Sequence, residues 1–380
     1  MSKIIYKQRT RDPKTKRVYS GSANYAYVLY TATRPGVLLS AEGAGVFGKL
    51  NAEDALRDFA DEKEVARFIS GLRKKNTLLF RGYVSMKDET KEQIELTDLD
   101  AWKRFVEKSV PIIRDKNDIK AENFGYICSV HIKKDQPHFH ISFWDRSSHN
   151  INHFVHPSKP DAIRKSLIRM AFENELEKLH QVQDISKSNI RGGGGAAPAV
   201  PLQSVSKRGR KAINKGIKEL LPLLPKRGRL TYMLIPKDAK EKLASLCKTV
   251  IDHSDYLRSA RERFIVSKLA EAGYFEENAD QSKIIDYEKE IDKVLANAML
   301  RYIKQNELSI PKTVYSRASA EGAVTALLNM LKAFLSASEN RERGGNAYRR
   351  ESLKNMSKEV MKLHISKLRE SEGQIDWEAF

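Results

Sequence analysis

Three of the nine histidines lie within ten residues of one another, and neutral imidazole is a common ligand of divalent metals. His138 and His140 are two positions apart, so in an extended strand both point to one side, while the apolar residues between and after them point to the other. The short polar segment through Pro137 predicts a hairpin turn that returns His131 to the same place. A lone histidine in a strand is more often a hydrogen-bonded structural residue. Three that converge favour a metal site with positions open for water or a substrate oxygen.

The elements around the histidines predict how they are held. Buried strands are expected over 124–130 and 78–86. The segments before and after these strands have apolar residues at helical spacing. Residues 1–19 are basic and are expected to be irregular, and the expected helices cover 20–33, 51–74, 97–113 and 161–183, the first ending at Arg34-Pro35-Gly36. Strands and helices mix without regular β-α-β alternation. This favours an α+β fold with a central antiparallel sheet and flanking helices.

The second half of the chain has a different pattern. Residues 192–201 are rich in Gly, Ala and Pro, which predicts a flexible connection and a domain boundary. Beyond it the periodicity is helical almost throughout, with helices expected over 239–253, 256–272, 282–305, 318–337 and 350–370. The predicted organisation is a first domain over 1–190, a basic Gly/Pro-containing linker over 191–230, and a mostly α-helical domain of unassigned role over 231–380.

Charge points to a polyanionic partner. The formal net charge is +19, and Lys and Arg side chains that neutralise phosphates drive sequence-independent binding to nucleic acid. Residues 191–230 alone hold ten Lys or Arg and one acid, a net of 10 − 1 = +9. We predict DNA contacts within that stretch, the alternative being a solvated basic loop. The candidates are Lys207, Arg208, Arg210 and Lys211.

Cysteine content and hydropathy indicate the compartment. Two cysteines, Cys128 and Cys247, are too few for a disulfide scaffold, and Cys128 is expected to pack inside a strand. No apolar run approaches the length that spans a membrane, and the first residues lack the apolar core of a signal peptide. We expect a cytoplasmic protein.

The histidine spacing resembles that of the HUH superfamily of single-strand DNA endonucleases and, within it, the conjugative relaxases. His131 is followed, after five residues, by Pro137-His138-Phe139-His140. Three segments are similar to the MobL-type relaxases of Gram-positive mobile elements, in the same order and over roughly the first 190 residues. They are 27–37, 80–85 and 130–145.

The resemblance implies a site- and strand-specific relaxase that nicks an origin of transfer. In such an enzyme His131, His138 and His140 hold Mn²⁺ or Mg²⁺, and a tyrosine attacks the scissile phosphate. The product is a covalent 5′-phosphotyrosyl-DNA intermediate, which serves plasmid or integrative-element mobilisation. The implied partners are single-stranded and origin-of-transfer DNA, a type IV secretion coupling protein and relaxosome accessory proteins. The protein could be translocated to a recipient cell bound to DNA.

Three tyrosines of the first helix compete for the role of nucleophile. Tyr30 is the prediction because relaxase nucleophiles of this type stand at the end of the first helix, just before a turn. Tyr27, one helical turn earlier, is the second choice, and Tyr25 is the third; the alternative for any one of them is a core aromatic. Arg34 either contacts the phosphate or caps the helix.

The sequence departs from the relaxase pattern at two places. Residues 37–40, after Arg34-Pro35-Gly36, lack the acid that the family often has there, and a second acid is missing after the first histidine. Many relaxases have an acid two residues after the first histidine, where this chain has Lys133. Asp135 or Asp145 could take over the orienting role, or either could be an ordinary turn or strand-end carboxylate.

Other functions fit the same residues. A rolling-circle replication initiator or transposase would use the same metal chemistry, but replication initiators usually have the tyrosine downstream of the histidines, and here it lies upstream. A non-catalytic DNA-binding component of the relaxosome would keep only the fold and the basic surface. A histidine-metal hydrolase of a small substrate fits poorly with a charge of +19.

Overall fold

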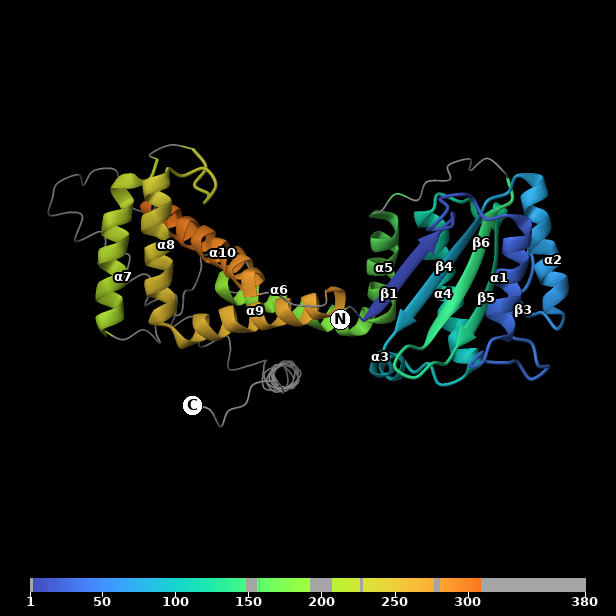
Figure 1. Cartoon of the computed structure of the whole chain (residues 1–380). Coiled ribbons are helices and arrows are strands. Elements are labelled where there is room, and N and C mark those ends of the chain that lie inside the picture. The colour runs from blue at the N-terminus through green and yellow to red at the C-terminus, as the bar shows by residue number, and fades with distance from the viewer. Residues whose placement is uncertain are drawn as a thin grey trace. The chain divides into compact units, whose positions relative to one another are not determined.

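The computed structural model describes residues 3–147, 156, 158–191, 207–225, 228–276 and 281–308 (Figure 1). The chain divides into two compact units. We call 1–176 with 273–277 the sheet unit, and 177–272 with 278–380 the helical unit. The α+β class is confirmed, with an antiparallel sheet, flanking helices and a helical region after them.

The sheet has six strands in the order β1-β4-β6-β5-β2-β3, and every pairing is antiparallel. Their bounds are β1 Ile4–Arg9, β2 Phe47–Lys49, β3 Arg57–Asp58, β4 Leu79–Met86, β5 Phe124–His131 and β6 His138–Asp145. The predicted hairpin and the strand before it are confirmed. The expectation of an irregular N-terminus was wrong, because β1 pairs with β4 along its whole length.

Helices cover the two faces of the sheet differently. On one face Phe139 packs edge-on against Trp102 of α4. On the other, Val28 of α1 and Ile69 of α2 share a core with Ile127 and Trp144. The helices that belong wholly or partly to this unit are α1 Gly21–Thr33, α2 Glu62–Leu72, α3 Asp88–Gln93, α4 Leu99–Lys116, α5 Ser158–Ala171 and α6 Glu173–Arg191, with short 3₁₀ helices at Arg73–Lys75 and Ala121–Asn123.

Two of the expected helices differ from those observed. Instead of one helix over 51–74, the structure has β3 and then α2, which starts where the Asp61 carboxylate accepts hydrogen bonds from the Lys63 and Glu64 backbone N–H groups. The helix expected over 161–183 is split into α5 and α6 at Phe172, which is fully buried.

The helical unit contains the rest of α6 with α7 Lys207–Leu220, the 3₁₀ helix Leu221–Leu223, α8 Lys237–Asp252, α9 Asp255–Phe275 and α10 Gln281–Leu308. α7 falls inside the stretch predicted as a linker, but Ile213, Ile217 and Leu220 are buried in the core of this unit. Residues 207–225 are therefore part of a packed domain. The stretch 192–201 and the helices expected over 318–337 and 350–370 lie outside the described residues.

The structure can be compared with two expectations from the sequence, one on the cysteines and one on membrane-spanning segments. Cys128 is buried within β5, as expected, and Cys247 is buried as well. Among the described residues, no helix has both the length and the apolar character needed to cross a membrane.

Candidate metal and phosphate site

The hairpin register brings the three histidines together. His131 pairs directly with His138, and Ser129 pairs with His140, so the three imidazoles share the sheet face that carries α1. Their ring centres are 5.1 Å apart for His131 and His138, 5.2 Å for His131 and His140, and 5.0 Å for His138 and His140. The convergence expected from the spacing is thus observed.

A short backbone link joins the end of α1 to the same hairpin. The Leu38 N–H donates to the Val130 carbonyl over 2.8 Å, and the Ile132 N–H donates to the Gly36 carbonyl over 2.8 Å. Gly36 has a φ of +88°, and a side chain there would meet the Ile132 carbonyl oxygen at 3.2 Å. The Arg34-Pro35-Gly36 turn therefore holds the last residues of α1 beside the histidines.

Two histidines are oriented by backbone carbonyls. His131 Nε2 lies 2.8 Å from the Thr31 carbonyl oxygen, and His138 Nδ1 lies 2.9 Å from that of Gln136. A carbonyl only accepts, so in the neutral rings these nitrogens carry the hydrogen and the other nitrogen of each ring keeps its lone pair. Thr31 is in the last turn of α1, where carbonyls lack partners within the helix.

His140 is oriented by a phenol. Its Nδ1 lies 3.1 Å from Tyr27 Oη. The Tyr27 ring is in turn covered by the guanidinium of Arg81, which lies 4.3 Å from the ring centre and donates to the Ala23 carbonyl and the Asn24 side chain. Tyr19 covers the same guanidinium at 3.5 Å, so Arg81 is held between two tyrosines.

Buried polar atoms without partners gather at this place. His131 Nδ1, His140 Nε2 and the hydroxyl of Ser85, which pairs with His138 in the sheet, have no hydrogen-bond partner among the described residues. Such atoms are costly in a protein interior unless a ligand or water satisfies them. The two imidazole nitrogens are the ones left open once the opposite nitrogen of each ring is engaged.

The spacing of the three rings matches that of ligands to one divalent ion, but their present arrangement does not form a ligand set. A metal–nitrogen bond of about 2.1 Å implies ring centres about 4.7 to 5.4 Å apart for ligand angles between octahedral and tetrahedral, and the observed spacings of 5.0 to 5.2 Å fall in that range. As they stand, no three His, Cys, Asp or Glu side chains in the described part of the chain form a complete metal cage. The three rings lie close together, but their side chains must rotate before all three can bind the same ion.

The electrostatics keep the rings neutral. Burial, with the charges of His138 and Arg34, lowers the pKa of His131 to about 4, although its hydrogen bond to the Thr31 carbonyl acts in the opposite direction. Burial, with the other two histidines and Arg34, lowers the pKa of His140 to about 3. Burial also lowers the pKa of His138, helped by Arg34 and Lys133. Unprotonated imidazoles at neutral pH are what metal ligation requires.

Comparison with models of protein families, with curated proteins and with solved structures finds no match. Any interpretation of its function therefore depends on the geometry of the site and on the residue pattern.

The structure separates the three candidate tyrosines. Tyr27 is half-buried against His140, and burial raises its pKa to about 12. Tyr30 is 54% exposed, with the Arg34 guanidinium 5.0 Å from its ring centre. Tyr25 packs against the apolar core between α1 and the sheet. Tyr27 thus contacts a histidine of the site, Tyr30 is exposed in the last turn of the same helix, and Tyr25 packs against the core.

The candidate DNA contacts lie in both units. Arg34 is the C-cap residue of α1, and its guanidinium lies 5.0 Å from the centre of the Tyr30 ring. The others are at the start of α7, where Arg208, Arg210 and Lys211 are exposed. The side chain of Lys207 lies outside the described residues.

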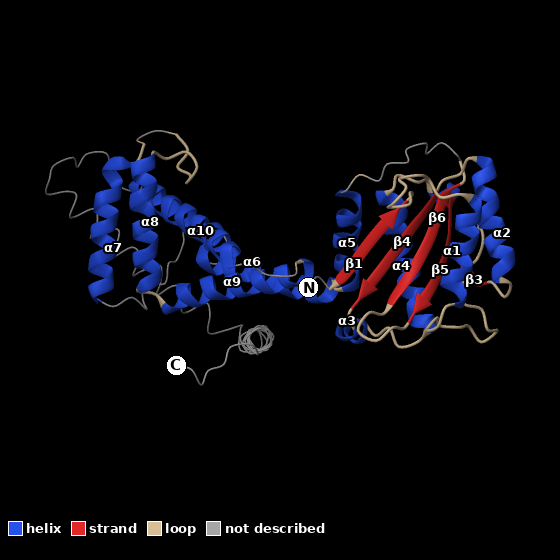
Figure 2. Ribbon diagram, viewed as in Figure 1, coloured by secondary structure: helices blue, strands red, loops and turns tan. Residues whose placement is uncertain are grey.

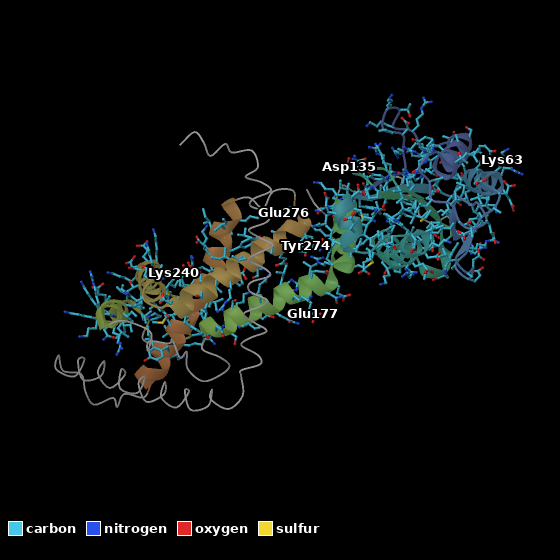
Figure 3. All side chains as sticks on the ribbon, turned by 90° about the horizontal axis from the view of Figure 1, so that it is seen from below. Lys63, Asp135, Glu177, Lys240, Tyr274 and Glu276 are labelled. Atoms are coloured by element: carbon cyan, nitrogen blue, oxygen red, sulfur yellow. The ribbon has the colours of Figure 1, made fainter. Side chains whose placement is uncertain are left out.

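Neither acid considered for orienting the histidines contacts them in the described structure. The Asp145 carboxylate accepts hydrogen bonds from Ser147. Asp135 lies in the exposed turn of the hairpin, where its backbone N–H donates to Asp88 (Figure 3). The orienting partners are instead the Thr31 and Gln136 carbonyls and the Tyr27 phenol.

Sequence reasoning missed two residues of β4. The Tyr83 ring lies 5.2 Å from that of His138 and 5.8 Å from that of His140, and Arg81 holds Tyr27. The signal was present in the alternation of β4, where Arg81, Tyr83 and Ser85 are polar and lie two apart, on one face.

Proposed function

We propose that the chain is a metal-dependent, site- and strand-specific DNA nickase of the HUH type, similar to the MobL relaxases, which acts at an origin of transfer. The observation that carries the proposal is the set of three neutral imidazoles with one nitrogen of each engaged, brought by a backbone link to the end of a helix that carries exposed Tyr30.

His131, His138 and His140 would hold Mn²⁺ or Mg²⁺. When bound, the ion supplies positive charge to the non-bridging oxygens of the scissile phosphate. The chain's own part is to fix the rings: carbonyl partners set the tautomers of His131 and His138, and Tyr27 orients His140.

Tyr30 is our candidate nucleophile. Its phenol oxygen would form a bond to phosphorus as the bond between phosphorus and the 3′-oxygen breaks. The phenol gives its proton to solvent, and the 3′-oxygen takes a proton from solvent and leaves as a hydroxyl. Exposure supports Tyr30 over Tyr27, because the attacking oxygen must reach a phosphate and Tyr27 is engaged with His140. Arg34 beside Tyr30 can bind a phosphate oxygen. The phosphotyrosyl bond conserves the energy needed for rejoining.

The remaining parts of the proposal concern partners. Arg208, Arg210 and Lys211 on α7, with Lys207, would bind DNA phosphates. A type IV secretion coupling protein and relaxosome accessory proteins are the proposed protein partners, and a cytoplasmic location stays a prediction.

A second candidate is a non-catalytic DNA-binding component of a transfer complex. The incomplete metal cage favours it, because only gathered rings are observed. A rolling-circle initiator or transposase would share the chemistry and differ in its target DNA.

The test is adduct formation. Full-length protein is incubated with supercoiled origin DNA and Mn²⁺ or Mg²⁺, and a covalent 5′-phosphotyrosyl product is sought. We expect Tyr30→Phe to abolish the adduct, whereas Tyr25→Phe forms it like the wild type. An undiminished adduct in Tyr30→Phe would exclude that nucleophile, and binding without an adduct under every metal would support the non-catalytic alternative.

A further inference from the structure

A cavity of about 540 Å³ lies on the sheet face opposite the histidines. Tyr126 pairs with Phe143, and Lys49 pairs with Tyr126, so these side chains point to the face on which α4 packs against Phe139. In the view of Figure 2 this helix lies behind the strands. The volume is within the range of small-ligand pockets, and no residue of the proposed nicking site lines it.

The cavity forms because strand β2 is shorter than its neighbour. β2 ends at Lys49, opposite Tyr126, whereas β5 extends to Phe124 beyond that pairing. Hydrogen bonds from Asn51 to the Asp54 carboxylate fix the turn after β2, which forms one wall, and α4 forms another. The cavity is therefore built from ordered elements of the sheet unit.

The floor of the cavity is apolar. The rings of Phe124 and Tyr126 lie with their centres 5.9 Å apart, and both residues are buried. The apolar parts of the walls are Ala52, Val110, Pro111 and Ala121. An apolar body of a ligand would thus find aromatic and aliphatic surface.

Charged side chains complete the lining, and some of them are already paired. Arg114 donates to the Asp115 carboxylate over 2.7 Å, and Arg146 lies 3.7 Å from Glu53. Those that have no ion-pair or hydrogen-bond partner in the described part of the chain are Lys49, Glu107 and Glu122. The cavity therefore offers one free ammonium group and two free carboxylates.

The hydroxyl of Tyr126 is also free. The residue is 3% exposed and lines the cavity, yet its hydroxyl has no hydrogen-bond partner within the described residues. Burial raises the pKa of Tyr126, and neighbouring Cys128 and Glu107 raise it further, so the phenol keeps its proton at neutral pH. A buried hydroxyl without a partner is costly unless a ligand or water satisfies it.

A proline in α4 adds an acceptor at the helical wall. Pro111 lies inside the helix and has no N–H to donate to the Glu107 carbonyl. That carbonyl therefore lacks its usual helical donor. An ammonium group has donors only, so one turn of α4 supplies it with two kinds of acceptor, a backbone carbonyl and the Glu107 carboxylate.

We propose that this cavity binds a small zwitterion with an apolar body, of the class of the aromatic amino acids. Its ammonium group would meet Glu107, its carboxylate would meet Lys49 and the Tyr126 hydroxyl, and its body would pack on Phe124. A ligand with one charge fits less well, because a plain amine faces Lys49 and a plain acid faces Glu107 and Glu122. The inference does not depend on the proposed function, since it concerns the other face of the sheet.

Three probes that share a phenyl ring separate the two charges. L-Phenylalanine carries both, phenethylamine carries only the ammonium group, and 3-phenylpropionate carries only the carboxylate. Each is titrated into full-length protein at neutral pH and low salt, and binding is measured by saturation-transfer NMR. L-Phenylalanine should bind with a Kd of about 1 mM, and about 5-fold or more tightly than either singly charged probe.

Single variants assign each charge to its partner. Glu107→Gln should abolish the preference for L-phenylalanine over 3-phenylpropionate, and Lys49→Gln should abolish the preference over phenethylamine. Tyr126→Phe keeps the ring and loses only the hydroxyl, so it should weaken L-phenylalanine about 2- to 10-fold. The matched controls are Glu64→Gln of α2 and Lys108→Gln of α4, which are exposed, do not line the cavity and should bind like the wild type.

Three results would overturn the inference. They are no binding of L-phenylalanine at about 10 mM, tighter binding of either singly charged probe by the wild type, and equal affinities for L-phenylalanine in the wild type, Glu107→Gln and Lys49→Gln. A protein that forms the DNA adduct but binds none of the probes keeps the proposed function and loses this site. One that binds the probes as expected but forms no adduct keeps the site and loses the nickase.

Discussion

The two faces of strand β6 are built from alternating residues and differ in what they do. On one face Phe139 and Phe143 are fully buried, and Phe143 stacks on Phe80 with ring centres 4.8 Å apart. On the other, His138 and His140 lie among buried polar atoms that lack partners. A strand that anchors a core on one side can thus carry polar groups without partners on the other.

Damage to the apolar face should have the largest effect on stability. Phe143→Ala removes a ring that also lies 5.6 Å from Phe124, and the cavity should lower the free energy of unfolding by about 3 to 5 kcal/mol. Denaturant unfolding is measured by tryptophan fluorescence in a Trp377→Phe background, where Trp102 and Trp144 report the sheet unit. Phe143→Leu should cost less. A loss under about 1 kcal/mol for Phe143→Ala would show that this face is not the stabilising one.

A change on the polar face should affect nicking much more than stability. His138→Gln removes one proposed ligand and should slow nicking about 10²- to 10³-fold, while the unfolding free energy changes by less than about 1 kcal/mol. Ser142→Ala, on the same face beyond His140, should nick at the wild-type rate. If His138→Gln lowers the free energy of unfolding as much as Phe143→Ala does, the histidine is structural and the two faces do not differ in role.

The same contrast explains what could be predicted from the sequence. The hairpin and the convergence of His131, His138 and His140 follow from two-residue alternation and a short turn, both local signals. The stop of α1 at Arg34-Pro35-Gly36 is equally local, and it is observed.

Long-range pairing could not be predicted. β1 pairs with β4, which lies more than seventy residues further along the chain. The alternating pattern of β1 is short and basic, so by itself it predicts an irregular basic tail. The contact between Tyr27 and His140 joins positions 113 apart and depends on the backbone link through Gly36. Composition predicts a linker where α7 lies, because the many charged residues there outweigh the three apolar residues that are buried.

The buried histidine His140 of the polar face should make the stability of the protein depend on pH. The folded pKa of His140 is lowered to about 3, so between pH 6.5 and 5 the unfolded chain binds a proton that the folded chain does not. Unfolding free energy should therefore fall as pH drops through this window, by up to about 2 kcal/mol for this histidine at pH 5. The measurement is denaturant unfolding at several pH values in EDTA.

His140→Gln should lose that part of the pH dependence, since its amide does not titrate in this range. His180→Gln is the matched control, because His180 is an exposed histidine of the helical unit, where it lies beside Glu271. The same fall in stability for wild type and His140→Gln would mean that His140 is not held neutral by burial.

The smallest expected effect comes from Tyr27, which touches the polar face without being a proposed ligand. Tyr27→Phe removes the oxygen 3.1 Å from His140 Nδ1 but keeps the ring under Arg81. Loss of such an orienting partner should weaken Mn²⁺ binding about 10-fold, measured by calorimetry, with little change in stability. Tyr25→Phe, in the apolar core, should bind the metal normally. A Tyr27→Phe protein with full metal affinity but no adduct would instead make Tyr27 the nucleophile, because then its oxygen is needed for the chemistry and not for orienting His140.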